Sequence, residues 1–282
     1  MGTQKLPGEA LLAWRRRFVA SLAVVLALNA CAMVETTESG AVGIDRRQSM
    51  SPLVSAEQIN RGAEEAYAQV LAEAKAKNAL NRDAAQTARV RTVAQRLIPQ
   101  TATFRADAPR WEWEVNVLTT PELNAWCMPG GKIAVYSGLL ERLQLTDAEL
   151  AAVMGHEIAH ALREHGRERA SRAVGQGVAL GVLGAITGIG DAGLDLAQLA
   201  LEMTLALPNS RTQEIEADRI GVELAARAGY DPHAAVTLWE KMGPPAQGTP
   251  PKWLSTHPPR EDRLRDLREY ADKMMPLYQA RR

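Results

Sequence analysis

The sequence predicts a mainly helical domain with one small β-sheet, an α+β fold. Capping signals and amphipathic stretches typical of helices cover most of the chain, whereas only two segments, 111–118 and 132–137, have the pattern of strands. The 282 residues, of which 46% are hydrophobic and 23% charged, suffice for a buried core and differ from the composition of a disordered chain.

The chain begins with an expected targeting segment. Lys5 and Arg15–Arg17 precede an uncharged apolar run from Phe18 to Ala30, which has the length of a signal-peptide core and is short for a membrane span. The Leu-Asn-Ala-Cys sequence that ends at Cys31 resembles a bacterial lipobox, in which the cysteine is lipidated after cleavage. A plain signal peptide cut near Ala32, or an uncleaved anchor, is the alternative.

Three regions are therefore expected. Residues 1–30 form a lipoprotein signal peptide with Cys31 as the first mature residue, residues 31–54 form a flexible tether because they are small and polar without periodicity, and residues 55–275 form the folded domain. The alanine after Cys31 favours the outer membrane, with the domain facing the periplasm.

The ends of the first two helices are marked in the sequence. Ser55 and Gln58 have the spacing of a capping box for a helix that runs to about Asn78. A second helical stretch runs from Asp83 to Ile98 and stops at Pro99.

The strands follow these helices. Trp111–Leu118 alternates apolar and polar residues, as a half-buried strand does, and Lys132–Ser137 is the second strand. The connection Asn124–Gly131 ends in a tight turn. Trp111 and Trp113 share one face of the first strand and are expected in the core.

Two capped helices follow in the second half of the chain. Thr146 and Glu149 form a second capping box, for a helix from about Asp147 to His165. Ser210 can cap a helix over Arg211–Ala228, which a glycine closes.

The remaining stretches of this half are less regular. The uncharged, glycine-rich stretch 173–190 favours a buried helical hairpin over a membrane-dipping or cleft-covering element. Asp231-Pro232 opens a short helix, 243–251 is a loop, and a last helix follows Pro258-Pro259.

Charge and cysteine content restrict the function. The equal numbers of basic and acidic side chains, 33 each, argue against a dedicated nucleic-acid-binding protein. Removal of residues 1–30 leaves 29 basic and 32 acidic groups. Two cysteines cannot build a disulfide framework or a four-cysteine zinc site, so a metal site has to draw on the five histidines.

The segment His156-Glu157-Ile158-Ala159-His160 is the candidate catalytic motif. Histidines four residues apart lie on one face of a helix, where both imidazoles can bind one zinc ion. Glu157 lies beside the first histidine, where a carboxylate can take a proton from water during attack on a peptide carbonyl and pass it to the leaving amine.

A catalytic zinc ion needs a third protein ligand. A third histidine at the metzincin spacing is absent, because position 166 is glycine. Glu214 and Asp218 are four residues apart on one helix, so Glu214 can be the ligand while Asp218 accepts a hydrogen bond from a ligand histidine. We expect His165 to point away from the metal face, as a histidine that complements the end of the helix dipole, and Glu216 to be solvated.

Four motifs together resemble metallopeptidase family 48, which includes HtpX, the type I CAAX prenyl proteases, the mitochondrial Oma proteases and periplasmic lipoprotein peptidases of bacteria. The resemblance runs from about Leu80 to Leu267 and is closest to the lipid-tethered branch without further membrane spans. The motifs are Asn124-Ala125-Trp126 with Pro129-Gly130-Gly131, His156–His160, Ser210–Asp218, and His257-Pro258-Pro259 with Arg263. The family more often has phenylalanine in place of Trp126.

The resemblance implies a zincin-like metallopeptidase domain with an HExxH active-site helix and one Zn²⁺ per chain. It assigns His156, His160 and Glu214 as zinc ligands, Glu157 as the catalytic acid and base, and Asp218 as the residue that orients a ligand histidine. It places His257 and Arg263 near the cleft as catalytic residues. There they would support either the oxyanion or the glutamate and histidine residues around the metal. The alternative for His257 is a helix cap. It assigns substrate binding to Asn124, Ala125, Trp126, Gly130 and Gly131, beside which backbone pairs with a substrate strand.

The resulting hypothesis is a zinc endopeptidase that hydrolyses misfolded or misassembled envelope proteins. The alternative is a lipid-anchored chaperone or assembly factor for outer-membrane proteins, with latent or rare proteolysis if stretch 173–190 covers the cleft. The presence of Glu157 favours the peptidase, since a pure binding protein gains nothing from it. The sequence has no glycine-rich phosphate loop and no basic stripe, so we expect no nucleic-acid partner, and it gives no prediction of oligomeric state.

Overall fold

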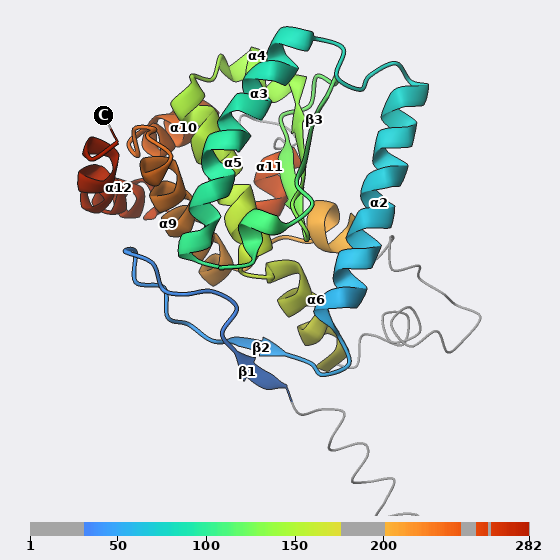
Figure 1. Cartoon of the computed structure of the whole chain (residues 1–282), viewed down its shortest axis with the longest axis vertical. Helices are drawn as coiled ribbons and strands as arrows, with labels where there is room; N and C mark the ends of the chain where they lie inside the picture. Colours follow the sequence, from blue (N-terminus) through green and yellow to red (C-terminus); the bar gives the residue numbers. More distant parts are fainter. Residues whose placement is uncertain (1–30, 176–200, 244–251, 259–260, 282) are drawn as a thin grey trace, which may run out of the picture.

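A small sheet lies among helices in the computed structural model, which describes residues 31–175, 201–243, 252–258 and 261–281 (Figure 1). The mainly helical fold with a small sheet is therefore confirmed. The elements run in the order β1 (Ala32–Val34), β2 (Gln48–Met50), α2 (Ala56–Ala76), α3 (Ala84–Leu97), η1 (Ile98–Thr103), η2 (Ala108–Arg110), β3 (Glu114–Leu118), β4 (Ala125–Met128), β5 (Lys132–Tyr136), α4 (Ser137–Leu143), α5 (Asp147–Leu162), α6 (His165–Gly175), η3 (Glu202–Ala206), α9 (Arg211–Arg227), α10 (Ala234–Met242), α11 (Lys252–Thr256) and α12 (Arg263–Gln279).

Local side-chain caps determine where the main helices begin. Ser55, Thr146 and Ser210 each form a complete capping box, at the starts of α2, α5 and α9. Asp83 caps α3 by accepting a hydrogen bond from the backbone N–H of Gln86. These contacts satisfy backbone donors that lack a partner inside the helix, which is why the predicted starts agree with the structure.

The central sheet has the strand order β3-β5-β4, with β3 parallel and β4 antiparallel to β5. Strand β4 lies within Asn124–Gly131, which we expected to be only a connection. All four of its residues are buried, so it lacks the polar alternation that marks a half-exposed strand. The predicted turn is present after it, with positive φ angles of 79° at Gly130 and 85° at Gly131.

Helices cover both faces of this sheet (Figure 1). Side chains of β4 and β5 alternate between two hydrophobic clusters, one shared with α3 and α5 and the other with α2. Trp126 belongs to the α2 side, where its ring meets Tyr67 edge-on with centroids 5.7 Å apart. Trp111 and Trp113 stack at 5.5 Å and are half-buried against the larger cluster, because β3 begins only at Glu114.

Helices α5 and α9 approach each other through two glycines. A Cβ atom at Gly221 would lie 2.7 Å from the backbone nitrogen of His156, and one at Gly155 would lie 2.8 Å from the carbonyl oxygen of Gly221. The two backbones are therefore in direct contact. This contact places α9 across α5 at the first histidine of the candidate motif.

Residues 31–54 differ from the flexible tether that we expected. Strands β1 and β2 pair antiparallel, and the backbone N–H of Glu38 donates to the carbonyl of Phe104. The segment is small and polar overall, but a few spaced apolar residues are buried, and these hold it against the domain. They are Val42, Ile44, Met50 and Val54.

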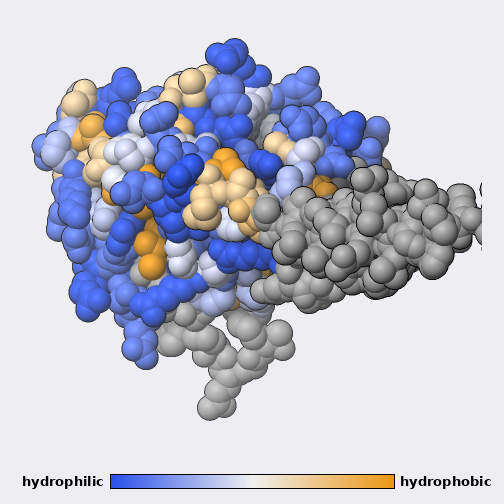
Figure 2. All heavy atoms as spheres, turned by 90° about the horizontal axis from the view of Figure 1, so that it is seen from below, coloured by the Kyte–Doolittle hydropathy of each residue, from blue (hydrophilic) through white to orange (hydrophobic). Residues whose placement is uncertain are grey.

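The described surface is mostly hydrophilic, with hydrophobic residues in small groups on the face shown in Figure 2. Among the described residues, Met33 and Leu207 are the large hydrophobic side chains that are exposed. Within the same residues, no helix combines the length and the apolar character needed to span a bilayer. The expected signal peptide and residues 176–190 of the glycine-rich stretch lie outside the described part of the chain.

Candidate metal centre

Helix α5 presents the two motif histidines side by side. His156 and His160 are one turn apart, and their Nε2 atoms lie 3.1 Å from each other. Nearly every residue of α5 from Glu149 onward is buried. The helix therefore runs through the core and delivers both imidazoles to a site away from bulk solvent.

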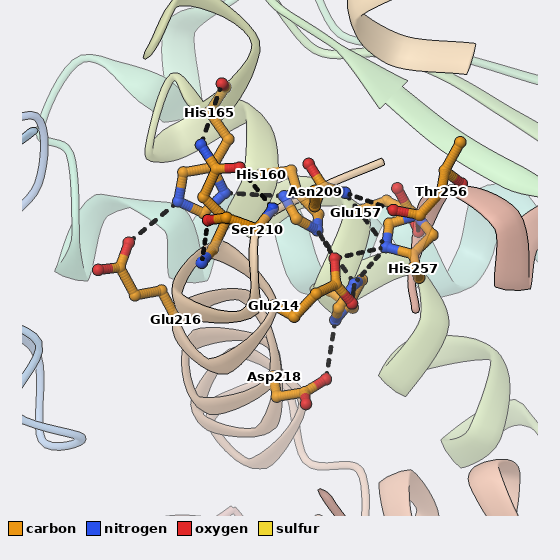
Figure 3. A network of polar contacts seen from close by, with 12 residues as sticks. Glu157, His160, His165, Asn209, Ser210, Glu214, Glu216, Asp218, Thr256 and His257 are labelled. Carbon is orange, nitrogen blue, oxygen red and sulfur yellow. Dashed lines mark hydrogen bonds and ion pairs between the residues drawn. The ribbon is translucent and has the colours of Figure 1, made fainter. Parts of the chain in front are cut away.

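Helix α9 brings Glu214 to these histidines, as Figure 3 shows. Its Oε1 atom lies 3.3 Å from Nε2 of His160, and its Oε2 atom lies 3.7 Å from Nε2 of His156. The close α5–α9 contact, together with the Ser210 cap one turn earlier, fixes this position.

His257 completes the cluster from the segment between α11 and α12. Its Nδ1 atom lies 3.0 Å from Nε2 of His156 and 2.9 Å from Oε1 of Glu214. One ligand atom from each of His156, His160, Glu214 and His257 lies within 4.8 Å of the others. The structure thus places His257 among the possible ligands, closer than the supporting position near the cleft that the family resemblance implies.

The four residues fit a zinc ion. Zinc takes nitrogen and oxygen ligands at roughly 2.0–2.2 Å, so ligands of one tetrahedral ion lie about 3.3 Å apart, close to the distances found here. The Oε2 atom of Glu214 is buried and makes no hydrogen bond, although the Arg263 guanidinium lies 3.1 Å from it, so the atom keeps a lone pair for a metal ion. Four such donors complete a tetrahedral shell, whereas any three of them leave one position open.

Burial and charge determine the protonation of this cluster. Burial lowers the pKa of His160 well below its usual value, which favours the neutral imidazole that a metal requires. Burial also opposes protonation of His257, but the carboxylates of Glu214 and Glu157 outweigh it and raise its pKa. Burial alone would raise the pKa of Glu214, yet the nearby histidines lower it well below the usual range.

A second layer supports the ligands from behind. The carboxylate of Asp218 lies 3.0 Å from Nδ1 of His156, in the orienting position expected for it. Arg263, at the start of α12, is buried, donates to Asp218 at 2.6 Å and lies 3.1 Å from Oε2 of Glu214. Its guanidinium covers the ring of Trp239. Arg263 therefore contacts the carboxylates of Asp218 and Glu214. The family resemblance implied that it supports either the oxyanion or the residues around the metal, and its position matches the second role.

The predictions for His165 and Glu216 are wrong. Nδ1 of His165 lies 2.7 Å from Nδ1 of His160, and its Nε2 lies 3.0 Å from Glu216, which is buried. The predicted helix continues through His165, whereas α5 ends at Leu162 and Glu164 has a φ angle of +50°. The chain turns back there, so α6 begins with His165 facing the metal cluster.

The side chains of the predicted substrate-binding residues do not gather at the metal cluster. Asn124, Ala125 and Trp126 are buried, and the Trp126 side chain points to α2, away from α5. Gly131 forms the turn and packs against Trp113, where a Cβ atom would lie 2.7 Å from the indole. Gly130 borders a separate small hollow beside α2.

The part of β4 that does reach the metal centre is its end. Cys127 and Pro129 line a small hollow together with Glu157, His160 and His257. Burial raises the pKa of the Cys127 thiol well above its usual value, with a smaller contribution from Glu157, so the thiol stays protonated.

Sequence reasoning missed two residues near Glu157. The indole N–H of Trp253 donates to Oε1 of Glu157 at 2.7 Å, and the Trp253 ring packs 4.8 Å from His257. Asn209 donates to the carbonyl of Thr256 at 3.2 Å and lies 3.4 Å from Nδ1 of His257. The four-residue spacing of Trp253 and His257, typical of one helix face, was the available signal for the first.

Comparison with known proteins agrees with this geometry. The model of peptidase family M48 matches residues 84–271, about two thirds of the chain. The chain is 41% identical over 155 residues to mitochondrial metalloendopeptidase OMA1 of Arabidopsis thaliana, covering 55% of this chain and 31% of that protein. It is 40% identical over 168 residues to OMA1 of Schizosaccharomyces pombe (56% and 47%), and 33% identical over 182 residues to the β-barrel assembly-enhancing protease of Escherichia coli (61% and 37%).

The matches therefore span about a third to a half of the length of these curated relatives. The family match includes all four predicted motifs and every residue of the metal cluster. The chain belongs to peptidase family M48, and the metallopeptidase class that its sequence predicted is confirmed.

Proposed function

We propose that this protein is a zinc-dependent endopeptidase. The observation that carries the proposal is the carboxylate of Glu157, which lies beside a complete set of zinc ligands and is held there by other side chains. Its Oε1 atom accepts the Trp253 hydrogen bond at 2.7 Å and lies 3.3 Å from Nε2 of His257. A buried carboxylate that is held beside a cluster of metal ligands is typical of a functional site.

In this proposal His156, His160 and Glu214 would hold the zinc ion and leave one position open, and His257 lies beside them. Zinc bound there supplies Lewis-acid activation of water and of a peptide carbonyl. Glu157 removes a proton from the attacking water at its carboxylate and returns it to the leaving amine. Trp253 holds Glu157 in place, while Asp218 and Arg263 keep the ligands oriented from behind.

Strand β4 supplies the substrate-binding edge. It is one of the two edge strands of the described three-stranded sheet, and its end lines the hollow that contains Glu157 and His160. An extended peptide can pair with the backbone of such an edge, which makes binding tolerant of substrate sequence. This suits misfolded or misassembled proteins as substrates, and the likeness to a protease that enhances β-barrel assembly supports that class.

We propose that the protein is a lipoprotein of the cell envelope and that its substrates are proteins of that compartment. Cys31 is exposed and immediately precedes β1, so an attached lipid is not obstructed by the domain. Because residues 31–54 pack on the domain, a lipid on Cys31 holds the domain close to the membrane surface. The N-terminal lipobox and the alanine after it support the outer membrane, with the domain facing the periplasm.

One observation favours the alternative of an assembly factor with latent proteolysis. One atom of each of the four donors, His257 included, lies within 4.8 Å of the others, and four donors would leave no open position on a tetrahedral zinc ion. Proteolysis therefore requires His257 to move away or the shell to expand. The two functions are separated by measuring casein cleavage by the wild-type protein and by a His257→Ala variant, which keeps three donors.

The decisive test of the peptidase is Glu157→Gln. The amide keeps the size of the side chain but cannot act as a base, so zinc content should stay at one ion per chain while casein cleavage disappears. Glu149→Gln is the matched control, since Glu149 is a buried carboxylate of the same helix that binds Thr237 and Lys241 instead of the metal cluster. Equal activity of Glu157→Gln and wild type would overturn the mechanism.

The ligand role of Glu214 has its own test. Glu214→Ala should lower the zinc content of the purified protein, whereas full retention would assign the third ligand to another acid, such as Asp218. Comparing envelope proteomes with wild-type and Glu157→Gln protein, the latter acting as a substrate trap, identifies the substrates.

A further inference from the structure

A buried polar chain leads from the metal centre to the N-terminal segment. It starts at Nδ1 of His160, continues through His165 and Glu216, and ends at Arg46. His165 and Glu216 are buried, and the side chain of Arg46 is 28% exposed. His165, Glu216 and Arg46 are neither candidate zinc ligands nor contacts of Glu157, so the proposed function gives them no role.

The direction of the hydrogen bonds follows from metal binding. His160 must offer the lone pair of Nε2 to a metal, because Nε2 faces His156 and Glu214, so its proton is on Nδ1. That N–H donates to Nδ1 of His165, which is 2.7 Å away. The proton of His165 is then on Nε2 and is donated to Glu216 at 3.0 Å.

This arrangement differs from the support of the other ligand histidine. His156 contacts a carboxylate directly, that of Asp218 at 3.0 Å. His160 reaches its carboxylate through an inserted imidazole. Each ligand histidine thus has one carboxylate that determines its tautomer and ring orientation, which is how outer residues commonly tune a metal site.

Two arginines hold Glu216 in place. Arg163 donates to its Oε2 atom at 3.1 Å, and Arg46 donates to both carboxylate oxygens. Arg46 also forms a paired contact with Glu168 at 2.7 and 3.1 Å, and Gln213 donates to the same carboxylate. Arg46 is therefore clamped between a residue of α9 and a residue of α6.

Arg46 belongs to the segment between Cys31 and α2. The segment is tied to the end of α5 at several points: the Arg46 carbonyl accepts from Arg163, Thr37 accepts from the same guanidinium, and the Gln48 amide donates to the Arg163 carbonyl. The N-terminal segment is thus continuous, through side chains, with the second ligand histidine.

We propose that His165 and Glu216 are positioning residues that hold His160 in its metal-binding tautomer, and that Arg46 makes the N-terminal segment a part of the metal centre. The proposal rests on the zinc site of the proposed function, although it concerns metal binding and not the hydrolytic step. It predicts that metal affinity depends on a residue of the segment that joins Cys31 to the domain.

The test measures Zn²⁺ affinity of the full chain by competition with a chelator, together with the visible spectrum after Co²⁺ substitution. His165→Leu removes the acceptor for the His160 N–H and should weaken Zn²⁺ binding roughly 10- to 100-fold and change the Co²⁺ bands. His165→Asn places an amide oxygen near the former Nδ1 position and should recover most of that affinity. Wild-type affinity in His165→Leu, or an equal loss in both variants, would overturn the role of His165.

Two arginine variants test the contribution of the N-terminal segment. Arg46→Met should weaken Zn²⁺ binding several-fold relative to Arg105→Met, since Arg105 is similarly exposed (22%) and ion-paired but contacts Asp107 and Glu164 instead of the chain to His160. Equal affinities in these two variants would overturn the role of Arg46. Casein cleavage measured in parallel separates the peptidase function from the positioning role. If the variants differ in Zn²⁺ affinity as expected but the wild type does not cleave casein, the result contradicts the peptidase function and leaves the positioning role intact.

Discussion

Replacement of Arg263 by methionine tests the electrostatic support of the metal centre. The Arg263 side chain is 2% exposed and lies 2.6 Å from Asp218 and 3.1 Å from Glu214, which are equally buried. Burial alone would raise the pKa of Asp218, but the charge of Arg263 and the contact with His156 together outweigh it and lower the pKa. Methionine keeps an apolar stem over Trp239 and removes the charge, so two buried carboxylates lose the cation that they share.

The expected loss of stability is large in the metal-free protein. Removing one partner of a buried ion pair leaves an uncompensated charge and costs about 3–5 kcal/mol. For a domain of this size, that corresponds to a fall in Tm of roughly 6–20 °C. In the zinc-loaded protein the loss should be smaller, because the metal ion then compensates Glu214.

Urea unfolding of the metal-free and zinc-loaded forms measures both effects. Arg219→Met is the matched control: Arg219 also lies beside α12, but its 2.7 Å ion pair with Asp266 is partly exposed, and its loss should cost less than about 1 kcal/mol. A destabilisation by Arg263→Met that is no larger than that of the control would refute the reasoning. So would an equal loss in the metal-free and zinc-loaded forms.

Three further changes test the catalytic group, the helix contact and the buried charges. Trp253→Phe removes the N–H that donates to Glu157, and kcat/KM for casein should fall roughly 10- to 150-fold, the equivalent of a hydrogen bond to a charged group, while zinc content stays constant. Gly221→Ala puts a methyl group 2.7 Å from the backbone nitrogen of His156, so the free energy of unfolding in urea should fall by about 1–3 kcal/mol and zinc should bind more weakly. Burial opposes ionisation of Glu216, but hydrogen bonds from an imidazole and a guanidinium lower its pKa from 4.5 to about 2. Because the folded-state pKa is the lower one, this stabilisation is present above pH 4.5 and is lost as the pH falls towards 2, which acid unfolding followed by circular dichroism measures.

Each change has a control or an opposing outcome. Trp111→Phe removes an indole hydrogen bond to Asp107 at the surface and should leave casein cleavage unchanged; the same result for Trp253→Phe contradicts its role. Gly166→Ala has space for the methyl group, with the nearest side-chain atom 3.8 Å away, so equal stability of this variant and Gly221→Ala contradicts the close helix contact. A free energy of unfolding that is constant between pH 4.5 and 2 contradicts the assignment for Glu216.

The parts of the fold that depend on local contacts were predictable. A capping box is complete within four residues, so the starts of α2, α5 and α9 could be read directly at Ser55, Thr146 and Ser210. The shared face of His156 and His160 follows from helix geometry alone, and the family motifs pointed to Glu214 before its position was known.

Other features depend on neighbours that are distant in sequence. Strand β4 is buried on both faces, so its four apolar residues carry no alternating pattern. The segment 31–54 has few apolar residues, and its order comes from contacts such as the one between the Val42 N–H and Glu223, which are 181 positions apart. Such contacts leave no periodic signal in the sequence.

The sequence by itself determined the metallopeptidase family, the main helices and the residue types that bind zinc, because these follow from short motifs and helical spacing. Only the tertiary structure decided that His257 lies among the candidate metal ligands, that Arg263 contacts Glu214 and Asp218 from behind, and that Arg46 reaches the chain to His160. The backward turn at Glu164 and the glycine contact between α5 and α9 produce this arrangement. The turn and the glycine contact set the direction of the chain in space, which a local sequence pattern does not encode. The role of a charged side chain near them depends on which side chains packing brings within hydrogen-bond distance.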